Sequence, residues 1–93
     1  MVKRFRKRPV EVNACQLTTT NYGEVKEWIT RSGGNAYLGA GNISIGIRTL
    51  EGDHRADVGD WIIQGVAGEF YLCEDDTFRR TYEPVTTPAS DEE

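Results

Sequence analysis

The single histidine of this 93-residue chain, His54, is the side chain best suited to acid–base chemistry near neutral pH. It lies between Asp53 and Arg55, and a catalytic triad would also need a nucleophile within hydrogen-bond reach. The candidate nucleophiles are Cys15 and Cys73, but both occur in strand-like patterns, where cysteine behaves as a small buried apolar residue. The sequence therefore does not predict a catalytic residue.

Four carboxylates, Asp53, Asp57, Asp60 and Glu69, could together supply oxygen ligands to magnesium or calcium. Turns offer a simpler explanation, because aspartates in Gly-Asp turns accept hydrogen bonds from nearby backbone amides. The two cysteines lack the spacing of zinc ligands, and we expect them to be free thiols in a reducing compartment. We therefore predict that the chain is not an enzyme and needs no metal and no cofactor.

A basic N-terminal arm precedes an acidic body. Five of the 11 basic residues lie in the arm, so the body has six basic residues against 15 acidic ones and a net charge of −9. Such an arm could bind an anionic partner, or it could be a solvated segment that complements an acidic body, including that of a neighbouring copy. Nucleic acid is disfavoured as a partner because the body has the wrong sign of charge. The arm cations are Lys3, Arg4, Arg6, Lys7 and Arg8.

One amphipathic helix is predicted near the N-terminus, over residues 21–31. Asn21 and Glu24 approximate a capping box at its start, and Gly33 supplies the left-handed residue that commonly ends a helix. One apolar face repeats with helical spacing and must pack on a sheet. Its members are Tyr22, Val25, Trp28 and Ile29.

Short strands with glycine-containing turns account for the remaining body. Alternation of apolar and polar residues predicts strands, and a short helical turn that carries Phe78 is expected after Cys73. The fold class is thus α+β, a mostly antiparallel curled sheet or a small barrel covered by the helix. The strands are expected at residues 9–17, 36–38, 43–48, 54–57, 61–63, 69–73 and 81–85.

Three regions are expected: the basic arm at residues 1–8, one globular domain at 9–85, and a disordered acidic tail at 86–93. The predicted core draws on both the helix and the strands. It comprises Val12, Val25, Trp28, Ile29, Ile45, Ile47, Trp61, Ile63, Phe70 and Leu72.

Several segments together resemble a widespread family of small bacteriophage and prophage proteins, mostly of undefined function. The resemblance covers residues 3–85, and its most specific part is Val58-Gly59-Asp60-Trp61-Ile62-Ile63 followed by Gly68-Glu69-Phe70-Tyr71-Leu72-Cys73. Leu17 stands where an aromatic residue is expected, and residues 32–42 have no counterpart. The resemblance implies a phage origin and brings no catalytic residues with it. Its other parts are residues 7–16, 21–25 and 49–52, Phe78, and residues 81–83.

The leading hypothesis is a phage-encoded accessory protein that binds a host protein in the bacterial cytoplasm and alters host physiology. No signal peptide and no membrane span are expected. The candidate contacts are the basic arm and three residues of a predicted hairpin, Arg48, His54 and Arg55. Open strand edges also suggest a homo-oligomer. Two alternatives are a minor virion or assembly component, and a protein that binds a signalling nucleotide through Tyr37, Tyr82, Arg48 and Arg55.

Overall fold

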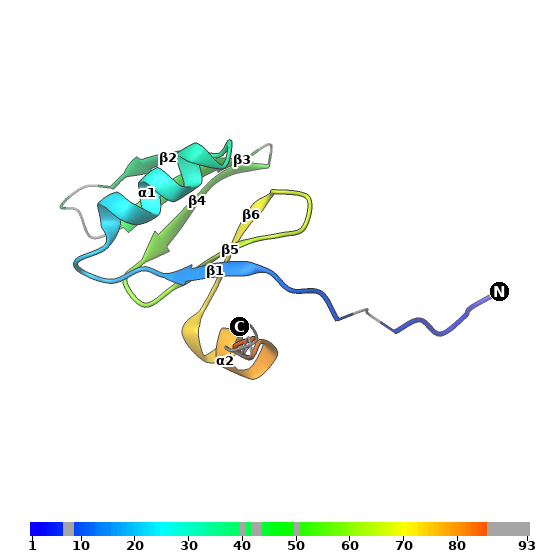
Figure 1. Cartoon of the computed structure of the whole chain (residues 1–93). Helices are drawn as coiled ribbons and strands as arrows, with labels where there is room; N and C mark the ends of the chain where they lie inside the picture. The colour runs from blue at the N-terminus through cyan, green and yellow to red at the C-terminus, as the bar shows by residue number, and fades with distance from the viewer. Residues whose placement is uncertain (7–8, 40, 42–43, 50, 86–93) are drawn as a thin grey trace, which may run out of the picture.

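The computed structural model describes residues 1–6, 9–39, 41, 44–49 and 51–85. Within these ranges the chain forms six strands and two helices (Figure 1). Lys7, Arg8 and the predicted tail at 86–93 lie outside the described residues. The elements are β1 (Asn13–Gln16), α1 (Tyr22–Arg31), β2 (Asn35–Leu38), β3 (Ser44–Thr49), β4 (Gly52–Asp57), β5 (Trp61–Gln64), β6 (Phe70–Cys73) and α2 (Asp75–Thr81).

The described strands form two separate antiparallel sheets. Sheet A has the order β1-β5-β6, and sheet B has the order β2-β3-β4. This arrangement confirms the predicted α+β class with curled antiparallel sheets. The small-barrel alternative is wrong for the described strands, because they divide into two three-stranded sheets instead of closing into one.

The helix α1 packs mainly on sheet B through the apolar face that its sequence predicts. Val25 and Ile29 are buried there, and the helix contacts β2 and β3 (Figure 1). Its end is a Schellman motif: Gly33 has a φ of 92°, Gly33 N donates to Thr30 O, and Gly34 N donates to Ile29 O at 2.8 Å.

The predicted capping box is wrong. The side chain of Asn21 makes no hydrogen bond to the first turn of α1. Instead, its Oδ1 accepts from Thr18 N and its Nδ2 donates to Gln16 O, both at 2.8 Å. Both polar atoms of the amide therefore hold the connection between β1 and α1, which leaves neither of them for the helix terminus.

The main core lies where α1, sheet B and one face of sheet A meet. Trp28 of α1 makes an edge-to-face contact with Phe70 of β6 at 5.4 Å between ring centroids. Five residues of the predicted core are only half-buried: Val12, Trp28, Trp61, Phe70 and Leu72. Phe70 and Leu72 border the space between the sheets, Trp61 packs on α2, and Val12 lies where the chain enters β1. The buried members of the cluster are Leu17, Val25, Ile29, Ala36, Ile45, Ile47, Ala56 and Ile62.

The opposite face of sheet A carries α2. The Trp61 ring stacks on Phe78 at 3.9 Å between centroids, and Phe78 stacks on Tyr82 at 4.9 Å. Ile63 shares a face with Trp61, since they are two residues apart in one strand, and it is buried outside the main cluster. The strand predicted at 81–85 is wrong, because α2 continues to Thr81 and places Phe78 against sheet A.

The first strand is shorter than its alternating sequence predicts. Pairing begins only at Asn13, which is opposite Gln64, the last residue of β5. Gly65 then starts a turn, and its N–H donates a hydrogen bond to Glu69 O at 2.8 Å. The strand β5 therefore does not extend far enough to pair with residues 9–12. The described part of the arm projects away from the body (Figure 1).

Neither of the described helices is long and apolar enough to cross a membrane.

Candidate functional site

An exposed tyrosine lies flat on the outer face of sheet B. Tyr37 of β2 is opposite Gly46 of β3, and Arg55 of β4 is opposite Gly46 on the other side. A Cβ atom at Gly46 would overlap the Tyr37 ring, so the ring occupies the space above this glycine. Glycine in mid-strand often marks such a close approach.

Two side chains from the neighbouring strands hold the Tyr37 ring in place. Its hydroxyl donates to Oδ2 of Asp53 at 2.8 Å, and the Arg48 guanidinium carbon lies 5.4 Å from the ring centroid. The hydrogen bond to Asp53 raises the pKa of the Tyr37 hydroxyl, as does partial desolvation, while Arg48 opposes the shift. Tyr37 therefore remains a neutral hydrogen-bond donor, fixed by a cation–π contact and a charge-assisted hydrogen bond.

The remaining members of this face are charged and exposed. Arg55 pairs with Asp57 at 3.2 Å, and both side chains are more than half exposed. The opposite face of the sheet packs on α1, whereas Tyr37 is 37% exposed. We call this surface the tyrosine face; it comprises Tyr37, Arg48, Asp53, Arg55 and Asp57.

The structure separates the three hairpin residues that the sequence groups together. Arg48 and Arg55 lie on the tyrosine face, as does Tyr37. His54 is opposite Ile47, so its side chain lies on the other face of sheet B. The side chains of His54 and Arg55 therefore point to opposite faces, because alternate residues of a strand do so, while His54 and Arg48 both border one cleft. Whether these residues bind a partner stays a prediction.

His54 borders an apolar cleft of about 650 Å³ between the two sheets. Its walls come from β3, β6 and the end of α1, and two exposed acidic residues, Glu51 and Glu69, belong to its lining. Both β4 and β6 are edge strands of their sheets. We call this feature the inter-sheet cleft; its lining is Gly33, Gly34, Ile47, Arg48, Thr49, Glu51, His54, Gly68, Glu69, Phe70, Tyr71 and Leu72.

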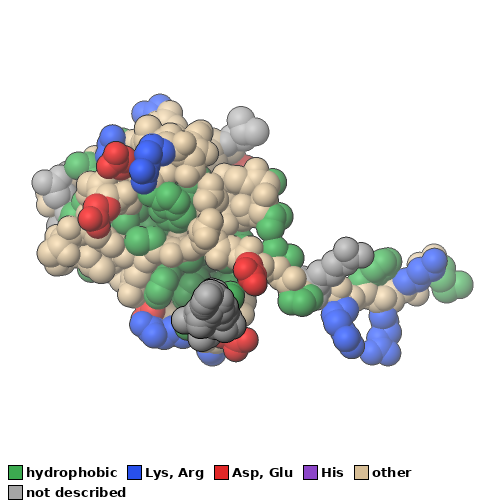
Figure 2. Space-filling view, in the orientation of Figure 1, with side chains coloured by type: hydrophobic (Ala, Val, Ile, Leu, Met, Phe, Trp, Pro, Cys, Tyr) green, Lys and Arg blue, Asp and Glu red, His purple; other side chains and the backbone are tan. Residues whose placement is uncertain are grey.

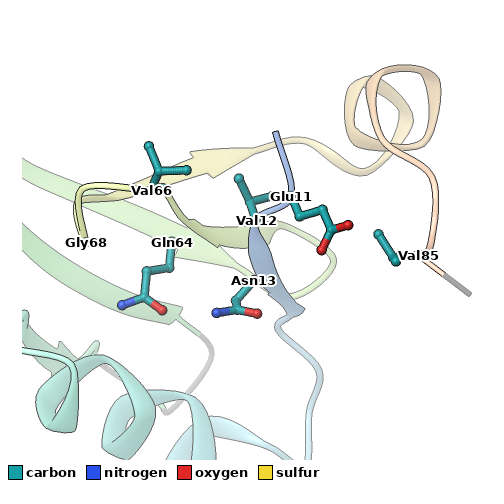
Figure 3. A pocket seen from close by; sticks show the side chains of 8 residues that line it. Glu11, Val12, Asn13, Gln64, Val66, Gly68 and Val85 are labelled. Atoms are coloured by element: carbon teal, nitrogen blue, oxygen red, sulfur yellow. The ribbon is translucent and has the colours of Figure 1, made fainter. Parts of the chain in front are cut away.

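A second hollow, of about 580 Å³, lies at the root of the arm (Figure 3). It is formed where the arm enters β1, where β5 turns at Gly65, and where the chain passes after α2. None of the residues predicted to bind a partner contributes to it. Its lining is Glu11, Val12, Asn13, Gln64, Gly65, Val66, Gly68 and Val85.

The arm cations that the structure describes, Lys3, Arg4 and Arg6, are all exposed. Figure 2 shows their blue side chains well separated from the body, next to apolar side chains of the same segment. Phe5 is 90% exposed and Val2 is 96% exposed. The arm therefore offers apolar as well as basic groups to a partner.

Three of the four carboxylates considered for metal binding make other interactions. Asp53 accepts from Tyr37, Asp57 pairs with Arg55, and Asp60 Oδ2 accepts from Asp57 N at 2.9 Å. Within the described ranges, no three His, Cys, Asp or Glu side chains are placed to hold a metal ion.

Both cysteines are free, and burial raises the pKa of each thiol. Glu24 adds to the shift at Cys15, and Glu74 adds to it at Cys73. A protonated thiol is a poor nucleophile.

The predicted nucleotide-binding set is also divided. Tyr37, Arg48 and Arg55 meet on the tyrosine face, but Tyr82 stacks on Phe78 beside sheet A. The bond from Tyr37 to Asp53 was not predicted. Gly46, which lies between two isoleucines of a strand pattern, was the available signal for a close approach.

Comparisons with protein-family models, curated proteins and solved structures found no match for this chain.

Proposed function

We propose that this chain is a phage-encoded, non-enzymatic accessory protein that binds a host cytoplasmic protein through the tyrosine face. The observation that carries the proposal is an exposed Tyr37 ring fixed over Gly46 by Asp53 and Arg48. The phage origin rests on the sequence resemblance, above all on residues 58–73.

The chemistry of the tyrosine face suits a protein partner. Tyrosine and arginine are enriched among the residues that contribute most to protein–protein binding. Because Tyr37 is already held, binding would cost little side-chain entropy at this position. The carboxylates of Asp53 and Asp57 lie beside the arginines, so the face is of mixed charge and offers both donors and acceptors. Small ligands, by contrast, usually occupy concave sites.

Affinity purification from the host tests this proposal when it is combined with measured binding of the recovered protein. Tyr37→Ala should weaken that binding by about 30-fold or more, the effect of a central contact residue. Arg48→Ala and Arg55→Ala should weaken it less and change its salt dependence. Tyr71→Ala is the matched control, since Tyr71 has a similar exposure of 39% but lies in sheet A.

Gly46→Ala provides a test that leaves the Tyr37 side chain intact. The added Cβ should displace the ring, and the partner should be lost although every side chain of the tyrosine face is still present. If wild-type protein recovers no host protein, and its expression leaves host growth unchanged, the proposed function is wrong. If a partner binds all of these variants equally, the tyrosine face is the wrong surface.

A further inference from the structure

The inter-sheet cleft and the arm are complementary features of the same chain. The cleft has an apolar lining that includes Phe70 and Leu72, with Ile47 almost fully buried at its base. Glu51 and Glu69 are its acidic lining residues and Arg48 is a basic one; the Glu69 carboxylate lies over Gly65, at the turn between β5 and β6. Ion pairs among the described residues involve Asp57, Asp75 and Asp76, and neither of these glutamates. The cleft thus suits a segment that is apolar and basic.

The arm is both apolar and basic, and its described residues are exposed to solvent. Phe5 is 90% exposed and is flanked by Arg4 and Arg6, with Lys3 nearby. Exposed phenylalanine on an extended segment is unfavourable in water and is commonly buried on association. The positive charge of the arm is also opposite in sign to the net charge of −9 on residues 9–93.

The segment that follows the arm, residues 9–12, can also add backbone hydrogen bonds. Residues 9–12 continue the direction of β1 but lie beyond the end of β5, so they take no part in sheet A. The edge strand β6 (Phe70–Cys73) borders the cleft, and an extended segment can pair with such an edge.

From these observations we propose that the arm of one copy binds in the inter-sheet cleft of a second copy. Phe5 packs against the cleft's apolar surface, and the arm cations lie near Glu51 and Glu69. Reciprocal exchange of two arms closes the assembly as a dimer with twofold symmetry. Arg48 borders the cleft as well as the tyrosine face, whereas Tyr37, Asp53, Arg55 and Asp57 lie outside the cleft lining. Substitution of Tyr37 therefore separates this proposal from the proposed function.

Sedimentation of the full chain tests for the assembly. Wild-type protein should associate beyond its 10.4 kDa monomer in the micromolar range. Phe5→Asp should weaken association by roughly 10- to 100-fold, the effect of losing one buried aromatic side chain. Val66→Asp is the matched control: Val66 is also an exposed apolar residue, at 76%, but it lies outside the cleft lining. Tyr37→Ala should leave association unchanged, which separates this test from that of the tyrosine face.

Charge reversal identifies the two surfaces directly. One variant carries Lys3→Glu and Arg4→Glu, and a second carries Glu51→Lys and Glu69→Lys. Each should be impaired in self-association, whereas an equimolar mixture should form a heterodimer, because both of its arm–cleft contacts again join opposite charges.

Wild-type protein that stays monomeric across the micromolar range would overturn the proposal. It would also be overturned if the mixture showed no recovery, or if Phe5→Asp and Val66→Asp behaved alike. A small molecule that co-purifies in native mass spectrometry and raises the melting temperature of the Phe5→Asp variant as much as that of the wild type would show that the cleft has a different occupant.

Discussion

The indole Nε1 of Trp61 donates a 2.9 Å hydrogen bond to Oδ1 of Asp75, which joins the central strand of sheet A to the start of α2. The same oxygen accepts from Arg79 Nε at 2.9 Å and from Gln16 Nε2 at 3.3 Å. The bond from Trp61 is the main cause that lowers the pKa of Asp75, with Arg79 contributing and partial desolvation opposing.

This pKa shift predicts a pH dependence for the packing of α2. A carboxyl group whose pKa is lowered by folding stabilises the folded state above its ordinary pKa of about 4, and this stabilisation is lost as the pH falls through the lowered value. Wild-type protein should therefore lose more thermal stability than Asp75→Asn between about pH 5 and pH 2. Melting curves of the two proteins, followed by tryptophan fluorescence, check this prediction; parallel curves would contradict it.

Leu17 is fully buried, and its N–H and C=O bond to Asp60 O and Gly59 N at 2.9 and 2.8 Å. Leu17→Ala should lower the free energy of unfolding by about 2–5 kcal/mol, because it removes buried methyl groups and leaves a cavity. Val66→Ala, at a 76% exposed position, should change it by less than about 0.5 kcal/mol. Urea denaturation measures both values, and equal effects would contradict the burial of Leu17.

Two glycines around α1 should respond in opposite ways to alanine. At Gly34 a Cβ would lie 2.6 Å from Ile29 Cγ2 and 3.1 Å from the Phe70 ring, so Gly34→Ala should destabilise the fold by about 1–3 kcal/mol. At Gly23, inside the helix, a Cβ would meet nothing within 4 Å, and Gly23→Ala should stabilise by about 0.5–1 kcal/mol. Thermal melting distinguishes the two; the reverse order would show that α1 approaches β6 differently.

The raised thiol pKa values predict low reactivity of Cys15 and Cys73 at neutral pH. Since only the thiolate attacks a disulfide, both cysteines should react with a disulfide reagent more slowly in the folded protein than in urea. The native rate should continue to rise with pH beyond about pH 8.5, where the rate of an ordinary thiol levels off. Single variants Cys15→Ser and Cys73→Ser assign the two rates, and a native rate equal to the urea rate at neutral pH would refute the prediction.

The local elements could be predicted because their periodicities are strong. Val25 and Ile29 repeat with helical spacing. The helix ends just before Gly33, which adopts the left-handed conformation expected of a glycine at that position. The strands β3 and β5 also lie where alternating or continuous apolar residues predict them. For these elements, local propensity and burial favour the same structure.

The division into two sheets and the position of the candidate surfaces could not be predicted. In a single closed sheet, β4 would pair with a strand of sheet A as well as with β3. Instead β4 is an edge strand of sheet B. The sequence of β4 alone does not distinguish these two arrangements. His54 was grouped with Arg48 and Arg55 by proximity in the chain, but the register of β3 and β4 sets which face each one occupies. The bond from Tyr37 to Asp53 spans the width of sheet B and likewise depends on that register.

The order of the strands along the chain has a consequence for how the protein folds. Sheet B is built from one continuous segment, Asn35–Asp57, so its two hairpins close short loops. In sheet A, the partners β1 and β5 are separated by residues 17–60, which contain α1 and the whole of sheet B. Forming that ladder first would require closing a long loop before any contact offsets the lost chain entropy. We therefore expect sheet B and α1 to form first, and the return of the chain to β1 to be the late step of folding.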